Sequence, residues 1–362
     1  MSPLLLHKFH QGIGARFSGL NGAEIVADYG HWPAEYKALR EAAGILDFSF
    51  RGRICLLGAD RVRFLHGQIT NDVKKLGMGE GCYAALTTAK GKMESDLNVF
   101  NLPDELLLDF EPGLTQKISQ RLEKYIVADD VQIVDAAPHY GLLSVQGTKA
   151  METVKAAGFM DAPQKEFSVT KIFDGALGEI YLAHRRRLLG EQPGFDIFVP
   201  NQSLGAVADK LIAAAKGAGG GPCGWAAFEA ARIEAGVPRF GVDMDETNLP
   251  MECDIQGRMV SFNKGCYLGQ EVLNRIHAIG HVTRELRGLR LADDLKTLPQ
   301  AHDKLFRDGK EIGYITSAVK SPALNANIAL GYVRREANQI GAELVLKTAS
   351  EESPVKIVKL PL

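Results

Sequence analysis

The segment SFNKGCYLGQEVLNRIHAIG, residues 261–280, contains the most unusual group of reactive side chains in the chain. Cys266 lies two residues after Lys264 and shortly before a helix that we predict to begin near Gly269. A thiol beside a cation and a helix N-terminus is expected to ionise readily and to react as a nucleophile. A packed cysteine in a glycine-rich loop explains the same residues equally well. His277 lies eleven residues beyond Cys266, so the sequence does not show a protease-like triad.

Two further segments carry polar groups that suit ligand binding. In AKGKMESDLNVF, residues 89–100, a glycine-containing turn leads into a predicted strand that begins at Asp96, whose carboxylate can accept a proton or bind an amine-bearing heterocycle. These residues alone favour a simpler interpretation, an acid at the surface end of a strand. In residues 224–253, Arg232 lies on a predicted helix and is explained by solvation or a structural salt bridge. The acids that follow it lack the alternating spacing of a calcium loop, so we expect no metal there.

Hydrophobic periodicity predicts the elements that position these groups. Apolar residues at intervals of three and four predict a helix within residues 31–49 that ends at Gly44, and helices within 60–76 and 113–127. Short apolar or alternating runs bounded by turn residues predict strands over Arg53–Leu57, Tyr83–Thr87, Leu97–Leu102 and Leu106–Phe110. This order predicts an α+β unit whose helices cover one face of a largely antiparallel sheet.

A second α+β unit is predicted from about residue 140 to residue 285. It contains predicted strands over 141–147 and 178–185 and predicted helices around 151–159 and 203–219. From Glu285 onward, closely spaced strands and turns predict a small all-β barrel or sandwich. We therefore divide the chain into residues 1–284, with two units and a boundary near residue 140, and residues 285–362.

The composition argues against several kinds of partner. The 362 residues carry 42 basic and 44 acidic side chains, and the formal net charge of −2 is too weak to favour nucleic acid. No segment approaches the roughly 20 apolar residues that cross a bilayer, so we expect no membrane association. The five cysteines form no C-x-x-C pair, which argues against a disulfide framework and a zinc knuckle. We expect reduced thiols and a cytoplasmic location.

Several segments resemble known families. KGCYLGQEVLNR, residues 264–275, resembles the signature of YgfZ-type proteins, which are folate-dependent factors for iron–sulfur protein maturation. Residues 44–100, 230–253 and 315–336 resemble three blocks of the wider aminomethyltransferase superfamily, which includes the glycine cleavage T-protein. The resemblance implies a folate-binding α+β fold of two α/β units with antiparallel sheets around a central channel, followed by a small C-terminal β-barrel.

The resemblance also implies a site for tetrahydrofolate. Asp96 corresponds to the second acid of a pair that lies against the reactive side of folate, and Ser95 replaces the first. Asp196, in GEQPGFDI, takes the place of the glutamate that holds the pterin, with one extra residue in the segment. Arg232 lines the same site. The full set that we predict to bind folate is Asp96, Asp196, Arg232, Glu234, Lys264, Tyr267 and Gln270, and the predicted catalytic residues are Cys266 and Asp96.

Two departures from the superfamily favour the YgfZ-like interpretation. Arg187 and Leu188 stand where the superfamily has a tyrosine, and aminomethyltransferases lack the K-G-C-Y-x-G-Q-E segment. Our main hypothesis is therefore a tetrahydrofolate-binding protein that acts on iron–sulfur client proteins or assembly factors, with Cys266 as a nucleophile or a cluster ligand. One alternative is a folate-dependent aminomethyltransferase or methyl-transferring demethylase, and another is a non-catalytic folate-binding module. The basic run His184–Arg187 suggests a contact for a polyglutamate tail, although a solvated charge cluster explains it better.

Overall fold

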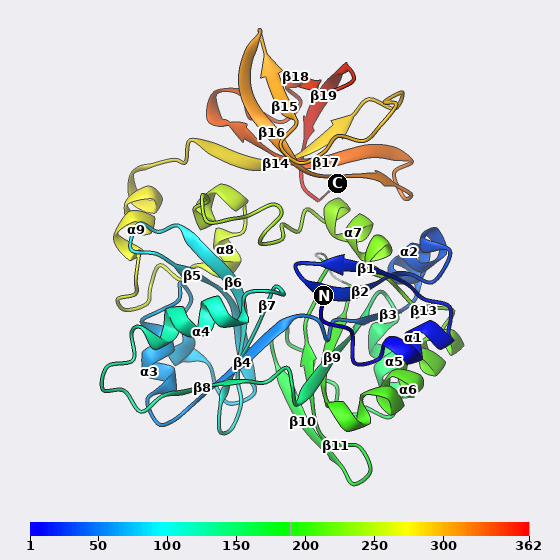
Figure 1. Cartoon of the computed structure of the whole chain (residues 1–362). Helices are drawn as coiled ribbons and strands as arrows, with labels where there is room; N and C mark the ends of the chain where they lie inside the picture. The colour runs from blue at the N-terminus through cyan, green and yellow to red at the C-terminus, as the bar shows by residue number, and fades with distance from the viewer. Residues whose placement is uncertain (189, 191, 362) are drawn as a thin grey trace. The chain divides into compact units, whose positions relative to one another are not determined.

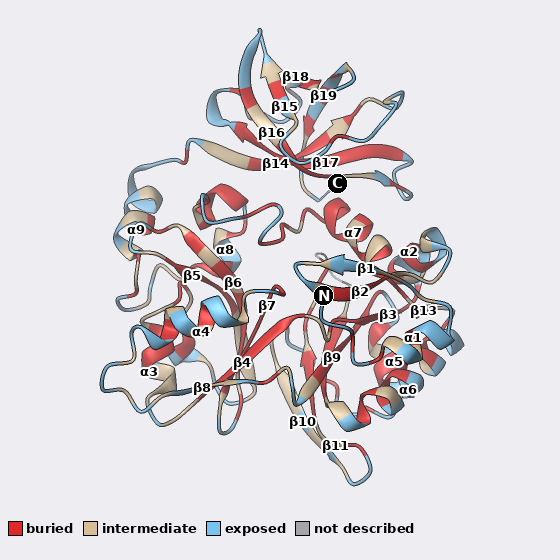
Figure 2. Ribbon diagram, viewed as in Figure 1, coloured by how far each residue is buried: buried red, intermediate tan, exposed pale blue. Residues whose placement is uncertain are grey.

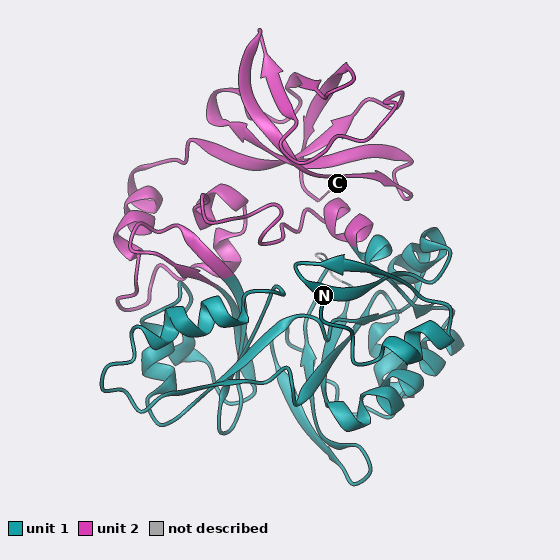
Figure 3. Cartoon of the chain, viewed as in Figure 1, with its two compact units in different colours: residues 1–84, 96–228 teal, residues 85–95, 229–362 magenta. Residues whose placement is uncertain are grey.

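The computed structural model describes residues 1–188, 190 and 192–361. The chain forms two compact units, which Figure 3 shows in different colours. Unit 1 comprises residues 1–84 and 96–228, and unit 2 comprises residues 85–95 and 229–362. The hairpin at residues 85–95 therefore belongs to unit 2 although both of its flanks belong to unit 1.

Unit 1 contains a two-stranded hairpin, a six-stranded sheet and most of a five-stranded sheet (Figure 1). The hairpin is β1 (Arg16–Leu20) and β2 (Ala23–Asp28). The six-stranded sheet runs in the order β10 (Val169–Asp174), β11 (Gly178–His184), β12 (Gly194–Pro200), β9 (Tyr140–Gln146), β3 (Gly44–Asp47) and β13 (Gly221–Pro222). The five-stranded sheet runs in the order β5 (Glu80–Thr87), β6 (Met93–Asn101), β7 (Leu106–Phe110), β4 (Gly52–Leu57) and β8 (Gln132–Asp135).

Most helices of unit 1 follow the predicted periodicity, with two differences in length, and the helix at His7–Gly12 was not predicted. They are α1 (His7–Gly12), α2 (Trp32–Glu41), α3 (Arg61–His66), α4 (Thr115–Glu123), α5 (Ala150–Ala156), α6 (Leu204–Gly217) and the start of α7 (Trp225–Glu234). The helix predicted within 60–76 is too long, because α3 ends at His66 and the Asn71 side chain binds the backbone of Tyr83 and Asp72 in a turn. Helix α2 ends at Glu41, since Gly44 already begins β3.

Gly44 explains why β3 packs so closely against α2. A Cβ at Gly44 would lie 2.3 Å from Leu39 Cδ2 and 2.8 Å from the Cys223 sulfur. Both neighbours are buried. Only glycine therefore allows β3 to approach the helix at this distance.

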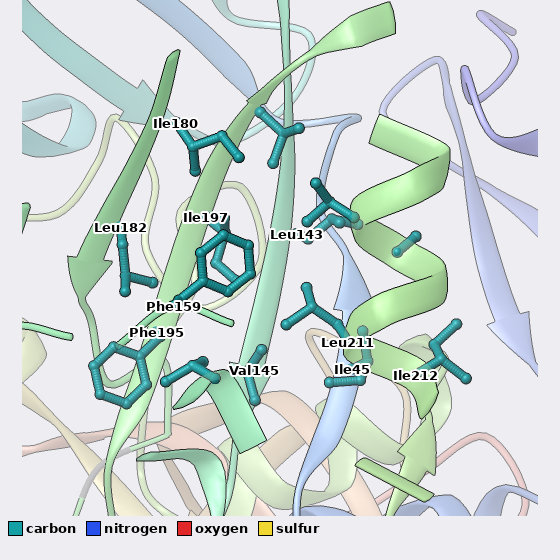
Figure 4. Packing of buried hydrophobic residues seen from close by; sticks show 14 of the residues in the cluster. Ile45, Leu143, Val145, Phe159, Ile180, Leu182, Phe195, Ile197, Leu211 and Ile212 are labelled. Carbon is teal, nitrogen blue, oxygen red and sulfur yellow. The ribbon is translucent and has the colours of Figure 1, made fainter. Parts of the chain in front are cut away.

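The main core of unit 1 lies between the six-stranded sheet and the helices α5 and α6. Figure 4 shows side chains of β9, β11 and β12 together with Leu211, which lies on the side of α6 that faces these strands. The sheet side contributes Val145, Ile180 and Ile197, which are fully buried. Figure 2 shows buried strands beneath helices whose outer faces are exposed, as amphipathic helices over a sheet require.

Unit 2 contains the closed barrel and two short helices. Helices α8 (Gln256–Met259) and α9 (Gln270–Ile279) precede the barrel. The barrel runs in the order β14 (Arg284–Leu291), β17 (Ala326–Arg334), β16 (Lys310–Ser321), β15 (Lys304–Arg307), β18 (Glu343–Lys347) and β19 (Glu352–Val358). A separate buried cluster that includes Leu289, Ile315 and Leu346 fills it. The predicted fold class is confirmed: two α/β units with sheets and a C-terminal β-barrel.

Candidate functional site

A network of charged and polar side chains, all buried except the partly buried Asp96, lies in unit 1, and we call it the polar cluster. It consists of Arg51, Asp96, Asn98, Asp109, Glu111, Ser144, Arg185, Arg187 and Asp196. Strands β6, β7, β9 and β12 and the segments beside β4 and β11 supply these residues. The cluster therefore joins the five-stranded and six-stranded sheets within unit 1.

Asp109 is the central acceptor of the polar cluster. It interrupts the apolar strand LLLDF of β7 and is completely buried. Its Oδ1 accepts from Arg51 Nε at 2.7 Å, and its Oδ2 accepts from Asn98 Nδ2 at 2.7 Å and from Arg187 Nη2 at 2.9 Å. Burial by itself raises the pKa of Asp109, but Arg187 and Arg51 outweigh burial and hold the pKa well below its usual range. Asp109 therefore stays ionised between two guanidinium groups.

Asp196 lies on β12, directly opposite Ser144 of β9, and is also completely buried. Arg187 donates to both of its oxygens, at 2.6 Å from Nη2 to Oδ2 and 3.2 Å from Nε to Oδ1. The Ser144 hydroxyl donates to Oδ1 at 2.8 Å. The Gln146 side chain fixes this arrangement, because its Oε1 accepts from the Arg187 backbone N–H and its Nε2 donates to Ser144. Protein donors thus already occupy the carboxylate that we predicted to hold the pterin.

Asp96 differs from the other acids of the polar cluster in its pKa. The prediction that Asp96 begins a strand was wrong, because β6 already begins at Met93. Asp96 lies within β6 and is partly buried. The Tyr83 hydroxyl donates to Asp96 Oδ2 at 2.8 Å. Burial raises the pKa of Asp96, and the negative charge of Glu111 adds to this, although Arg51 opposes both. A carboxyl group with a raised pKa takes up a proton more readily than an ordinary aspartate.

The run His184–Arg187 is not a solvated charge cluster. Arg185 and Arg187 are buried, and Arg185 Nε donates to Asn98 Oδ1 at 2.9 Å. Arg186 pairs with Glu166. The sequence reasoning failed here because no local motif links these arginines to their acids: Asp109 lies 78 residues from Arg187 and Glu166 lies 20 residues from Arg186, although Asp196 lies only nine residues from Arg187. Of the GEQPGFDI segment, Glu191 lies outside the described residues.

In unit 2, Arg232 is held entirely by protein acceptors. Its guanidinium donates to Glu229, Asp243, Ser317 and the Val237 carbonyl, so each of its five N–H groups has an acceptor. Arg232 is completely buried. These contacts form a structural salt bridge that joins α7 to the following loop and to the barrel. The sequence analysis had offered a structural salt bridge or solvation for Arg232.

Glu234 and the Cys266 segment lie in unit 2 as well. Glu234 is buried and accepts a hydrogen bond from the Ser321 hydroxyl. Cys266 is exposed, and α9 begins at Gln270 as predicted, after Gly269 at φ 92°. A Cβ at Gly269 would lie 2.4 Å from the Thr88 carbonyl oxygen, so this position requires glycine.

Three predicted site residues make local contacts within the Cys266 segment. The Lys264 ammonium lies 4.7 Å from the centre of the Tyr267 ring. The Gln270 Oε1 accepts from the Tyr267 backbone N–H at 3.0 Å. Burial raises the pKa of Tyr267 to about 12, and its buried hydroxyl has no partner among the described residues. These contacts order the loop before α9.

The structure therefore brings Asp96 and Asp196 into one cluster in unit 1 and places the other predicted residues in unit 2. The sequence reasoning missed Arg51, Asn98, Asp109 and Glu111. One signal for Asp109 was available, since an acid inside the apolar run LLLDF is unusual for a buried strand. The described residues contain no group of three or more His, Cys, Asp or Glu side chains that could hold a metal ion.

Among the residues that the structure describes, no helix is long and apolar enough to cross a membrane.

Comparisons with known proteins cover the whole chain. The family described as "GCVT N-terminal domain" matches residues 6–264, and the "Glycine cleavage T-protein C-terminal barrel domain" matches residues 284–362. A protein of Herpetosiphon aurantiacus named "Aminomethyltransferase" is 29% identical, over 100% of this chain and 98% of its own length. A protein of the same name from Desulfitobacterium hafniense is 30% identical, over 94% of this chain and 92% of its own.

A solved structure has the same fold. The crystal structure of glycine cleavage system aminomethyltransferase T from Bartonella henselae matches with a TM-score of 0.89 and 23% identity. The match covers 99% of this chain and 97% of that one.

These findings overturn our main hypothesis of a role in iron–sulfur protein assembly or repair. Relatives that match along essentially the whole chain are named aminomethyltransferases, and they favour the alternative that we had placed second. The hypothesis failed because it gave residues 264–275 more weight than the rest of the chain. Iron–sulfur client proteins are likewise unsupported as partners.

Proposed function

Because the chain belongs to the glycine cleavage T-protein family, we propose that it is a folate-dependent aminomethyltransferase, an enzyme that transfers a one-carbon unit from an amine-bearing donor to tetrahydrofolate. The observation in the structure that carries the proposal is Asp96, a carboxyl group with a raised pKa in a buried polar cluster. Tetrahydrofolate is the acceptor substrate. A cytoplasmic location and the YgfZ-like subtype remain predictions.

Asp96 has the properties of the group that handles the proton of the reacting amine. A transfer from one amine to another requires a proton to leave the attacking nitrogen and to reach the departing one. The raised pKa lets Asp96 take up this proton, and the Tyr83 hydroxyl fixes one of its oxygens. We therefore assign to Asp96 the orientation of the amine and the transfer of its proton.

The remaining acids of the polar cluster have a different role in this proposal. Asp109 accepts from Arg51 and Arg187, and Asp196 accepts from Arg187 through both oxygens. They hold Arg51, which acts on Asp96, and Arg187 in place, and in this proposal they are positioning residues. Asp196 then affects a bound pterin through Arg187, whose guanidinium it orients.

Arg232, Glu234, Lys264, Tyr267 and Gln270 remain proposed folate-binding residues, and Cys266 remains a proposed catalytic residue. Arg232 is fully engaged by protein acceptors, so in this proposal it shapes the site and does not donate directly to folate. Cys266 is exposed and free to react.

The test is the formation of 5,10-methylene- or 5-methyl-tetrahydrofolate from a panel of methylamine-type donors. We expect Asp96→Asn to lower kcat by about 10²- to 10⁴-fold, the range for loss of a general acid–base group. The control is Asp209→Asn, an exposed acid on α6. No folate product from the wild-type protein with any donor would refute the proposal.

The pH profile separates an acid–base role from a structural one. Because the pKa of Asp96 is raised, its ionised fraction should fall at a higher pH than that of an ordinary aspartate, about 3.9. Wild-type kcat should therefore decline on the acidic side, and Asp96→Asn should lack this limb. An unchanged profile in the variant would assign the proton transfer to another group.

A further inference from the structure

A row of polar side chains crosses three neighbouring strands of the five-stranded sheet in unit 1. Asn98 of β6 is the register partner of Asp109 of β7, and Asp109 is in turn the register partner of Arg53 of β4. Asn98 Nδ2 donates to Asp109 Oδ2 at 2.7 Å, so these two side chains lie on the same face of the sheet. Because side chains alternate along a strand, the residues two positions away in each strand belong to this face as well.

These residues form a second row, in which two acids are neighbours. Continued by two residues, the register places Asp96 opposite Glu111 and Glu111 opposite Arg51. A contact confirms the second pairing, since Arg51 Nη1 donates to Glu111 Oε1 at 2.6 Å. Like charges at opposite positions of two strands repel each other. In agreement with this, burial raises the pKa of Asp96, and among the neighbouring charges Glu111 raises it most.

The surroundings do not cancel the charge of Glu111. Glu111 is 4% exposed, so water screens it only weakly. Its partner Arg51 is shared, because Arg51 Nε donates to Asp109 at 2.7 Å. After burial and Glu111, Arg51 and the Tyr83 hydroxyl lower the pKa of Asp96, and Asp109 raises it. Glu111 therefore has the largest effect of the groups that face Asp96 from β5, β7 and the start of β4.

We propose that Glu111 is a positioning residue for the transfer reaction and acts through Asp96. Its negative charge favours the form of Asp96 that has taken a proton from the attacking amine. In that step the N–H bond breaks, the electron pair stays on nitrogen and an O–H bond forms on Asp96. The role of Glu111 in catalysis rests on the proposed function, whereas its effect on the proton of Asp96 does not.

The proton of Asp96 can be followed by ¹³C NMR of the whole protein labelled at aspartate Cγ. The Asp96 signal is identified by its loss in Asp96→Asn. The test variant is Glu111→Gln, which removes the charge and keeps the shape, and Glu111→Asp restores the charge. The matched control is Glu41→Gln, because the Glu41 side chain is 65% exposed in the same unit. The acidic limb of kcat in the folate assay is measured on the same variants.

We expect Glu111→Gln to lower the pH at which Asp96 titrates by about one to two pH units, because a like charge a few ångströms away is removed. The acidic limb of kcat should move to lower pH by the same amount. The plateau of kcat should also fall several-fold, because Asp96 becomes a weaker base. Glu111→Asp should titrate within about half a pH unit of wild type, and Glu41→Gln should not differ from it.

Two results would overturn the proposal: an Asp96 signal that titrates at the wild-type pH in folded Glu111→Gln, or an equal shift in Glu111→Asp. If Glu111→Gln does not fold, the wild-type protein labelled also at glutamate Cδ decides, because coupled groups titrate in shared steps. Independent single-step titration of Asp96 and Glu111 would then overturn the proposal. If the wild-type protein forms no folate product, the proposed function fails, and the NMR titration still decides whether Glu111 controls the proton of Asp96.

Discussion

Asp109→Asn should strongly destabilise unit 1, because it removes the charge that two buried arginines share. The substitution keeps the shape of the side chain but replaces one carboxylate oxygen with an amide nitrogen, which cannot accept a hydrogen bond. The oxygen lost is the one that accepts from Arg51 at 2.7 Å or the one that accepts from Arg187 at 2.9 Å. Breaking a buried ion pair from one side costs about 3–5 kcal/mol. In the variant, Arg51 still pairs with Glu111 and Arg187 still pairs with Asp196. We therefore expect a loss of unfolding free energy at the lower end of this range, about 3 kcal/mol.

The unfolding of unit 1 can be measured on its own. The chain has two tryptophans, Trp32 and Trp225, and both lie in unit 1, so tryptophan fluorescence during urea unfolding reports on this unit. A loss of about 3 kcal/mol should lower the urea midpoint by about 1 M, given slopes of up to about 3 kcal/mol per M. The control is Glu41→Gln, which removes an exposed pair with Lys37 at 3.6 Å and should change the free energy of unfolding by no more than about 0.5 kcal/mol.

The pH dependence provides a second check. The pKa of Asp109 is lower in the folded than in the unfolded protein, so its contribution to stability is present above the unfolded value, about 3.9, and is lost as the pH falls through the folded value. The difference between wild type and Asp109→Asn should therefore be largest near pH 7 and shrink below about pH 4. A variant within about 1 kcal/mol of wild type at pH 7 would refute the reasoning.

Further predictions concern packing, the buried arginine of α7 and the cysteines. Gly44→Ala should lower the free energy of unfolding of unit 1 by about 1–3 kcal/mol, because the added Cβ meets Leu39 and Cys223, and the same fluorescence assay measures it; a neutral result would show that β3 can move away from α2. Arg232→Gln should destabilise unit 2 by about 3 kcal/mol or more, since Asp243 and Glu229 lose their shared cation, and calorimetric unfolding would detect this as a lowered transition. Cys266 should react with a thiol reagent before any other cysteine, because it is the exposed one, and Cys266→Ala should abolish the fast phase; a fast phase that persists would contradict the exposure.

The order of helices and strands along the chain could be predicted, because local patterns of apolar residues determine these elements. The alternation and helical spacing of apolar residues gave α4, α6, β7 and the β-rich C-terminal region close to their observed bounds. Helix α3 was predicted too long because a helical pattern continued beyond His66, where the Asn71 side chain binds backbone groups instead.

The site was harder to predict because its partners are distant in the sequence. Asp96 and Asp196 were named from the resemblance, yet the contacts that determine their chemistry come from Arg51, Glu111 and Arg187. Arg187 was noted as a departure from the superfamily pattern and as part of the basic run His184–Arg187, but not as a partner of these acids. Its pairing with Asp109, which is 78 residues away in the sequence, follows from the pairing of strands and not from any local motif.

The sequence by itself determined the secondary structure, the family and the residue types available for chemistry, since these depend on local periodicity and on motifs. Only the tertiary structure decided which acids are ionised partners of arginine and which one can exchange a proton. The reason is physical: the pKa of a carboxyl group depends on its burial and on charges within a few ångströms, and folding brings those charges together from separate strands.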